Sequence, residues 1–128
     1  MIFGGGRQEA EIAEGWQGES KNILSVIGQF SMPEELALIN NCDAIITMDS
    51  ANMHLASLTK TQIISIWGAT HPFAGFTAFG KSHHGIVQKE LWCRPCSVFG
   101  NRACYKKTYE CLSIDETEII KKVEESLL

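Results

Sequence analysis

The residues best suited to chemistry stand in three short segments, each directly after an apolar run. The first segment is Gly4-Gly5-Gly6-Arg7-Gln8-Glu9. Glycines after a strand let a ligand approach the backbone, and the free N–H groups at the start of the next helix attract an anion. Glu9 would then accept hydrogen bonds from a ribose diol. The alternative is a tight turn in which Glu9 only complements the helix dipole, because the segment lacks the full dinucleotide-binding pattern.

The second segment reads Met48-Asp49-Ser50-Ala51-Asn52-Met53-His54. Asp49 or Ser50 would cap the helix that follows. The first N–H groups of that helix, which belong to Ser50, Ala51 and Asn52, would face a diphosphate. One turn later, His54 would donate a hydrogen bond to phosphate. The alternative is an ordinary helix cap followed by a histidine of the core.

The third segment is Trp67-Gly68-Ala69-Thr70-His71-Pro72. Gly68 would open space beside the second segment, and Thr70 would supply a hydroxyl. His71 would close over a ligand together with the aromatic residues of the loop, which are Phe73, Phe76 and Phe79. The alternative is an ordinary strand-end turn whose aromatic side chains pack on the edge of the sheet.

Four of the five cysteines gather within residues 91–111, and they are Cys93, Cys96, Cys104 and Cys111. The first two form a C-x-x-C knuckle, and four thiolates can hold one structural zinc ion in a tetrahedron. No acidic residue occurs between Leu91 and Thr108. The second pair of cysteines lacks the matching C-x-x-C spacing, so two disulfides or reduced core thiols remain alternatives. Cys42 lies apart and is expected in the core.

Hydrophobic periodicity predicts short strands that alternate with amphipathic helices. The predicted strands are residues 1–4, 22–27, 43–48, 62–67 and 85–88, and the predicted helices are residues 8–16, 31–42 and 50–59 with a last one after residue 113. Capping boxes begin two of the helices, at Ser31-Met32-Pro33-Glu34 and at Ser113-Ile114-Asp115-Glu116. The last helix would turn four side chains inward, those of Ile119, Ile120, Val123 and Leu127. This order predicts an α/β fold, a Rossmann-like, doubly wound parallel sheet, in which ligands bind at the carboxyl ends of the strands.

Length and composition narrow the classes of function. The chain has 128 residues, a net charge of −4, 45% hydrophobic residues and 20% charged residues. We expect one domain, residues 1–128, with no linker and no internal repeat. Mild acidity argues against nucleic-acid binding, and the longest apolar run, Leu36 to Ile39, is too short to cross a membrane. No phosphate-binding P-loop and no Gly-x-Ser-x-Gly elbow occur.

At these residues the sequence resembles glycosyltransferase family 9, the ADP-heptose:lipopolysaccharide heptosyltransferases. The family pattern is Asp-Ser/Thr-Gly-x-x-His-Leu-Ala, followed by Phe-Gly-x-Thr. This chain reads Asp49-Ser50-Ala51-Asn52-Met53-His54-Leu55-Ala56, then Trp67-Gly68-Ala69-Thr70. The glycines before Glu9 and the Cys-x-Pro-Cys stretch also resemble family members, so the similarity covers nearly the whole chain.

The resemblance implies the C-terminal, donor-binding half of a GT-B fold, in which two Rossmann-like domains flank the active site. It implies a nucleotide-sugar donor, ADP-heptose or a similar one, at Gly4, Gly5, Glu9, Asp49, Ser50, Ala51, Asn52, His54, Gly68 and Thr70. The acceptor, the lipopolysaccharide core or another glycan, and the catalytic base would belong to a domain outside this chain. We therefore assign no catalytic residue. Inverting transfer in the family needs no metal, and a zinc ion at the cysteines would be structural.

Ala51 departs from the pattern, because the family has glycine there. A methyl group would hinder a positive φ or a close phosphate contact.

The chain also begins within a predicted strand. We expect a cytoplasmic fragment that is inactive alone and whose parent protein is peripheral to the inner membrane face. An exposed sheet edge would favour self-association. Two other functions remain open: an interaction domain organised by a four-cysteine zinc site, and a GT-B enzyme whose donor carries another base.

Overall fold

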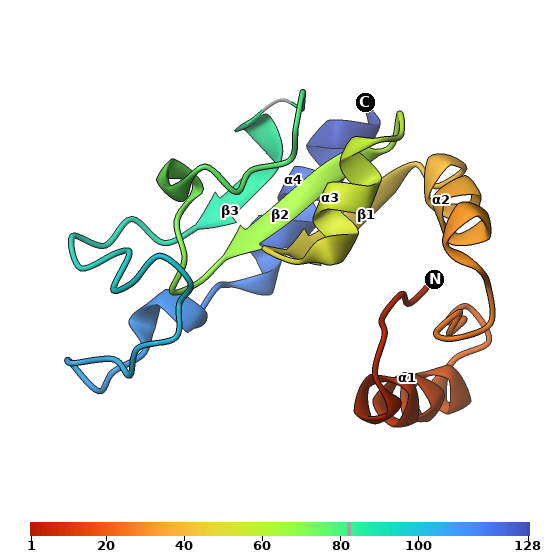
Figure 1. The fold of residues 1–128 in the computed structure, drawn as a ribbon, viewed down its shortest axis with the longest axis horizontal. Coiled ribbons are helices and arrows are strands. Elements are labelled where there is room, and N and C mark those ends of the chain that lie inside the picture. Colours follow the sequence, from red (N-terminus) through yellow and green to blue (C-terminus); the bar gives the residue numbers. More distant parts are fainter. Residues whose placement is uncertain (82) are drawn as a thin grey trace. The chain divides into compact units, whose positions relative to one another are not determined.

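The computed structural model describes residues 1–81 and 83–128, together with all their side chains except that of residue 84 (Figure 1). The chain forms two compact units, Met1–Leu38 and Ile39–Leu128. In the part of the chain that is described, no helix is long and apolar enough to cross a membrane.

The first unit is built on helix α1 (Arg7–Glu19). A single parallel bridge joins Ile2 to Ser25, with Ile2 N–H donating to the carbonyl of Leu24 over 2.8 Å. The two strands predicted for residues 1–4 and 22–27 are therefore wrong in extent. The Val26 N–H donates to the carbonyl of Ile2 over 3.0 Å, and the Ser25 N–H, on the other edge of this segment, donates to Gln17 Oε1 of α1 over 2.8 Å.

Helix α2 (Met32–Asn40) begins where the first capping box predicted. The Ser31 N–H donates to Glu34 Oε2 over 2.8 Å, and the Ser31 hydroxyl donates to the same oxygen over 2.6 Å. These bonds favour the ionised carboxylate and lower the pKa of Glu34, with the hydroxyl contributing most. The structure confirms this helix start.

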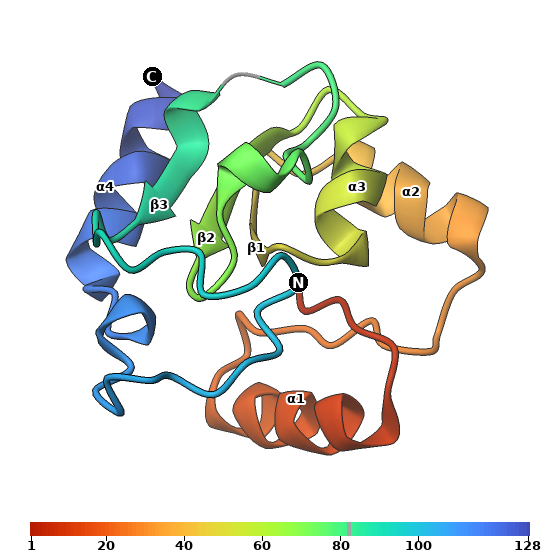
Figure 2. The same ribbon diagram turned by 60° about the vertical axis from the view of Figure 1, so that its left-hand side comes forward.

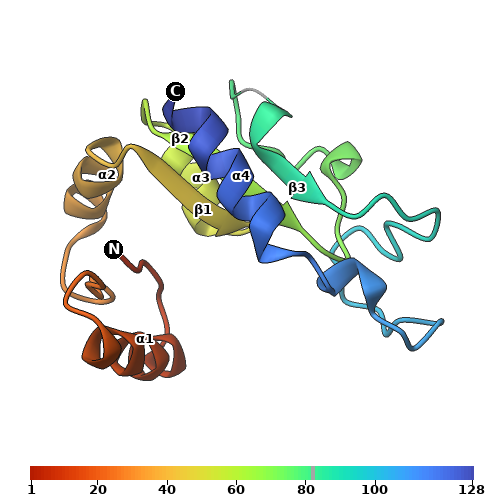
Figure 3. The same cartoon turned by 180° about the vertical axis from the view of Figure 1, so that it is seen from behind.

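The second unit contains a parallel sheet of three strands in the order β1 (Ala44–Met48), β2 (Gln62–Trp67) and β3 (Ile86–Gln88). Helix α3 (Ala51–Ser57) covers one face and helix α4 (Glu116–Leu127) covers the other, as Figures 1 and 3 show from opposite sides. Figure 2 shows the three strands running side by side between these helices. The predicted α/β class with a parallel sheet is confirmed.

The core of this unit lies between β2 and α3. Ile64, Trp67, Met53 and Ala56 have no exposed surface. The buried polar groups are satisfied locally, since Trp67 Nε1 donates to the hydroxyl of Ser65 over 2.9 Å. Because β2 is the central strand, its end at Trp67 is held firmly, and the turn that follows starts from a fixed point.

The start of α4 differs from the prediction. Asp115 caps the helix, with Oδ1 accepting from the N–H of Thr117 over 2.9 Å and from its hydroxyl over 2.7 Å. Ser113 instead ends a short 3₁₀ turn, η3 (Glu110–Leu112), and donates its N–H to the carbonyl of Glu110. The expected Ser113 cap is therefore wrong.

The inward face of α4 is narrower than predicted. Ile119 and Val123 are partly buried, but Ile120 and Leu127 are 54% and 55% exposed. Ile120 lies 100° around the helix from Ile119, and Leu127 lies in the final turn. Only a stripe centred on Ile119 and Val123 meets the sheet.

The Asp115 cap predicts a pH-dependent stability. Hydrogen bonds from the N–H and hydroxyl of Thr117 lower the pKa of Asp115 in the folded chain. A lowered folded pKa gives a stabilising contribution that is complete above the unfolded pKa, about 3.9, and is lost as pH falls through the folded value. Asp115→Ala should lower the melting temperature at neutral pH, and this difference should shrink in acid.

Thermal melts monitored by circular dichroism between neutral pH and pH ~2 check this, with the acid end below the ordinary aspartate pKa. Glu124→Gln, on the exposed side of α4, is the matched control. A melting difference for Asp115→Ala that stays constant across this range would contradict the assignment of Asp115 as the cap.

Candidate functional site

The carboxyl ends of β1 and β2 bring two of the three predicted segments together. Met48 pairs with Ile66 in the parallel register, so both strands end at the same edge of the sheet. A cavity of about 520 Å³ lies there. Its lining includes Asp49 after β1 and both Gly68 and Thr70 after β2. The second and third segments therefore form one site, in which a carboxylate and a hydroxyl share a cavity.

The far wall of this cavity comes from the end of the cysteine-rich segment. A Cβ atom on Gly68 would lie 2.6 Å from Leu112 Cδ2, closer than real Cβ contacts allow. Cys111 and Leu112 both line the cavity, and Ile114 and Ile119 extend the apolar wall toward α4. Leu112 is 60% exposed and Cδ2 is the end of its flexible side chain, so this contact shows that Leu112 lies against Gly68.

The remaining residues of the second segment follow Asp49 onto α3. Ser50 is the N-cap residue, but its side chain makes no cap hydrogen bond. Its hydroxyl lies 3.0 Å from that of Thr47 instead. His54 is exposed, so the alternative of a core histidine is wrong. The side chains of α3 do not line the cavity around Asp49 in the described chain.

Ala51 is the first residue of α3 and has no positive φ. The backbone strain that alanine would suffer at a glycine position is therefore absent. Only the methyl group itself remains as a difference from the family pattern.

His71 has a structural role, and its expected contact with a ligand stays a prediction. Its side chain is buried, and Nδ1 accepts the N–H of Phe73 over 3.1 Å to cap the turn η1 (Pro72–Ala74). Phe73 and Phe79 are 94% and 84% exposed, so the alternative of aromatics packed on the sheet edge is wrong for these two residues.

The first segment belongs to the other unit and is ordered by Glu9. Oε2 of Glu9 accepts from the N–H of Gly5 over 2.8 Å and of Gly6 over 3.3 Å. A Cβ on Gly4 would lie 2.7 Å from the same oxygen. The interpretation of Glu9 as a carboxylate at the start of α1 is confirmed, and its contact with a ribose stays a prediction.

The sequence did not predict the role of Arg94, which lies between the two cysteines of the C-x-x-C knuckle. Its guanidinium donates to four carbonyls: Gly68 over 2.6 Å, Lys89 over 2.6 Å, Thr70 over 2.8 Å and Trp67 over 3.2 Å. Burial lowers the pKa of Arg94. The partners lie up to 27 residues away in sequence, and no local pattern marks them.

The four clustered cysteines line one small cavity of about 160 Å³. The four clustered cysteines are free thiols. Among residues 1–81 and 83–128, no three His, Cys, Asp or Glu side chains are placed to hold a metal ion. Backbone N–H groups, chiefly that of Tyr109, lower the pKa of Cys104, whereas burial raises the pKa of Cys111. This arrangement is that of reduced thiols, and structural zinc stays a prediction.

Comparison with known proteins identifies the family. The model of glycosyltransferase family 9 (heptosyltransferase) matches residues 1–107. Lipooligosaccharide heptosyltransferase 2 of Campylobacter jejuni subsp. jejuni serotype O:2 is 27% identical over 132 aligned positions, covering 100% of this chain and 40% of the relative. Lipopolysaccharide heptosyltransferase 3 of Escherichia coli K12 is 43% identical over 60 residues, covering 47% of this chain and 17% of the relative. The chain thus spans at most two-fifths of these relatives.

The fold agrees with that assignment. A crystal structure of the glycosyl transferase family 9 from Veillonella parvula superposes with a TM-score of 0.68 and 22% identity, over 98% of this chain and 35% of that one. Since the family model matches most of its length, the chain belongs to glycosyltransferase family 9, the heptosyltransferase family.

Proposed function

We propose that this chain forms the donor-binding part of an inverting glycosyltransferase of lipopolysaccharide synthesis, and that its donor is ADP-heptose or a similar nucleotide-sugar. The observation that carries the proposal is the single cavity shared by Asp49, Gly68 and Thr70 at the carboxyl ends of β1 and β2. In open α/β sheets, this edge is where ligands bind.

Each group of residues in the site would contact a different part of the donor. The Asp49 carboxylate accepts hydrogen bonds from sugar hydroxyls, and the Thr70 hydroxyl adds a donor or an acceptor. Ser50, Ala51, Asn52 and His54 follow Asp49 directly and would meet the diphosphate. In the other unit, Glu9 would meet the ribose with the oxygen that does not bind the backbone of Gly5 and Gly6.

Transfer of the sugar requires more than donor binding. An acceptor hydroxyl must lose its proton to a general base as it attacks the anomeric carbon. We assign that base, and the binding of a lipopolysaccharide-core acceptor, to parts of the parent enzyme outside this chain. The chain would therefore bind the donor on the cytoplasmic side of the membrane without turnover, and it would need no metal for the chemistry.

Nuclear magnetic resonance titration with ADP-heptose, ADP and UDP tests the proposal. The amide signals of residues 49–54 and 68–70 should shift on addition of the adenine compounds and saturate with a common dissociation constant. UDP should shift these signals less. An equal or larger shift with UDP would indicate that the donor carries a base other than adenine. No shift at these residues with any of the three compounds would refute donor binding by this chain.

A further inference from the structure

The guanidinium of Arg94 joins three parts of the second unit at one point. It donates hydrogen bonds to the carbonyl of Trp67, at the end of β2, and to the carbonyls of Gly68 and Thr70, in the turn that follows. It also donates a hydrogen bond to the carbonyl of Lys89, just beyond the end of β3. The planar fork of arginine can serve several acceptors at once, and lysine cannot reproduce this geometry.

These bonds fix the direction of the peptide groups that line the cavity. In a trans peptide, the C=O of one residue and the N–H of the next point in opposite directions. The peptides of the turn are trans, since the single cis bond of the described chain is Arg94–Pro95. With the carbonyls of Trp67 and Gly68 held on the guanidinium, the N–H groups of Gly68 and Ala69 point away from it.

Gly68, Ala69 and Thr70 all line the cavity beside Asp49, whereas Arg94 does not. The arginine therefore lies behind the turn and acts on the cavity only through the peptide groups. We infer that Arg94 is a positioning residue that orients the N–H groups of Gly68 and Ala69 toward the donor, an inference that rests on the proposed donor-binding function.

The cost of losing Arg94 follows from the acceptors that it serves. Without the guanidinium, four carbonyls lose a charged donor, and the turn can rotate its peptides to face water. A hydrogen bond to a charged group changes an equilibrium by about tenfold to about a hundredfold. We expect Arg94→Ala to weaken ADP binding by a factor in this range, with the signals of Gly68 and Ala69 shifted even without ligand.

The matched variants are Arg94→Ala, Arg94→Lys and Arg102→Lys. Arg102 belongs to the same segment and is exposed, so its substitution should leave ADP binding unchanged. Ethylguanidinium added to Arg94→Ala should restore much of the ADP affinity, because it refills the vacated volume with the same fork of donors. Ethylammonium should not, because it lacks the planar fork of donors.

Ligand-free measurements keep this inference separate from the proposed function. The Arg94 Nε–H should exchange with solvent at least about tenfold more slowly than that of exposed Arg102, as a bonded, part-buried donor does. If the wild-type chain does not bind ADP, the donor proposal fails. The exchange rate of the Arg94 Nε–H and the ligand-free signals of Gly68 and Ala69 still test the positioning role of Arg94.

Two results would overturn the inference. One is Arg94 Nε–H exchange as fast as that of Arg102. The other is an Arg94→Lys variant that binds ADP as wild type does and keeps the wild-type signals at Gly68 and Ala69. The lysine variant also covers the case in which Arg94→Ala fails to fold, because it keeps the charge and the aliphatic stem while removing the fork.

Discussion

Asp49→Asn should weaken the binding of ADP-heptose by about tenfold to about a hundredfold while leaving the fold intact. The substitution keeps the size of the side chain and removes its charge, so each hydrogen bond from a sugar hydroxyl loses the contribution of a charged acceptor. Asp49 is part-buried at the cavity, where solvent competes less than at the surface. Isothermal titration calorimetry of the two chains measures the effect.

The control is Asp43→Asn, at the opposite end of β1. Asp43 is exposed, and its carbonyl rather than its side chain accepts the N–H of Gln62. Affinity for ADP alone sharpens the interpretation. If Asp49 binds the sugar, Asp49→Asn should weaken ADP-heptose much more than ADP. Equal losses for both ligands would move Asp49 to the diphosphate, and no loss for either would remove it from the site.

The sequence was most informative where an element is fixed by its own residues. The strand predicted for residues 62–67 matches β2 residue for residue, because a run rich in isoleucine between a threonine and a glycine defines both ends. The Ser31 cap of α2 was also predictable, since its partner Glu34 lies only three residues away. The site edge followed from the parallel order of the strands.

The predictions fail where a hydrogen-bond partner that is distant in sequence determines the local structure. The bridge between Ile2 and Ser25 does not lengthen into a ladder, and no local pattern predicts the bond from the Ser25 N–H to the side chain of Gln17, eight residues earlier. Asp115 rather than Ser113 caps α4, because Ser113 ends the 3₁₀ turn η3 and the helix begins only at Glu116. The carbonyl partners of Arg94 lie in a turn that only the folded chain brings near, so no spacing rule could reveal them.

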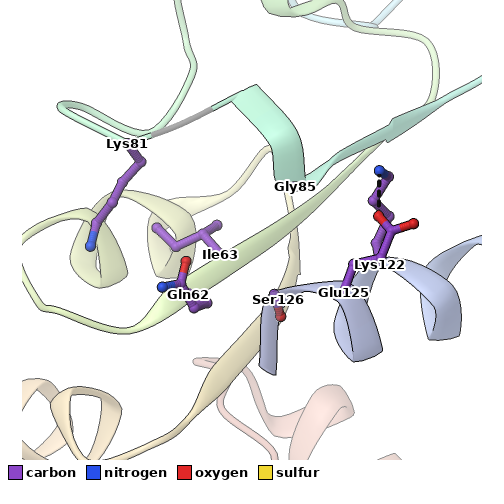
Figure 4. A pocket seen from close by; sticks show the side chains of 7 residues that line it. All are labelled: Gln62, Ile63, Lys81, Gly85, Lys122, Glu125 and Ser126. Carbon is purple, nitrogen blue, oxygen red and sulfur yellow. Dashed lines mark hydrogen bonds and ion pairs between the residues drawn. The ribbon is translucent and has the colours of Figure 1, made fainter. Parts of the chain in front are cut away.

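Gly85→Ala should be the most destabilising single methyl addition that the structure shows. A Cβ on Gly85 would lie 2.0 Å from the carbonyl oxygen of Ile63 and 3.0 Å from its carbonyl carbon. These are backbone atoms of the central strand β2, and Figure 4 shows Gly85 and Ile63 among the residues that line one pocket. The neighbour cannot rotate aside as a side chain would.

Relief requires either β2 or the turn η2 (His83–Gly85) to move, and Ile64, next along β2, is fully buried. Overpacking of this kind costs about 3 kcal/mol, which lowers the melting temperature by roughly 10 °C in a chain of this size. Urea unfolding followed by tryptophan fluorescence measures the cost, because Trp67 is fully buried in the unit that contains β2 whereas Trp16 and Trp92 are already exposed in the folded chain.

Gly75→Ala separates the collision from the general cost of replacing a glycine. Gly75 has a φ of 86° but nothing within 4 Å of its Cβ position, so its substitution carries only the left-handed penalty of about 1–2 kcal/mol. Because Gly85 has no positive φ, its larger loss would have to come from contact with Ile63. A loss at Gly85 no greater than that at Gly75 would mean that β2 gives way easily, and the end of β2 could not then hold the Gly68 turn firmly against the cavity.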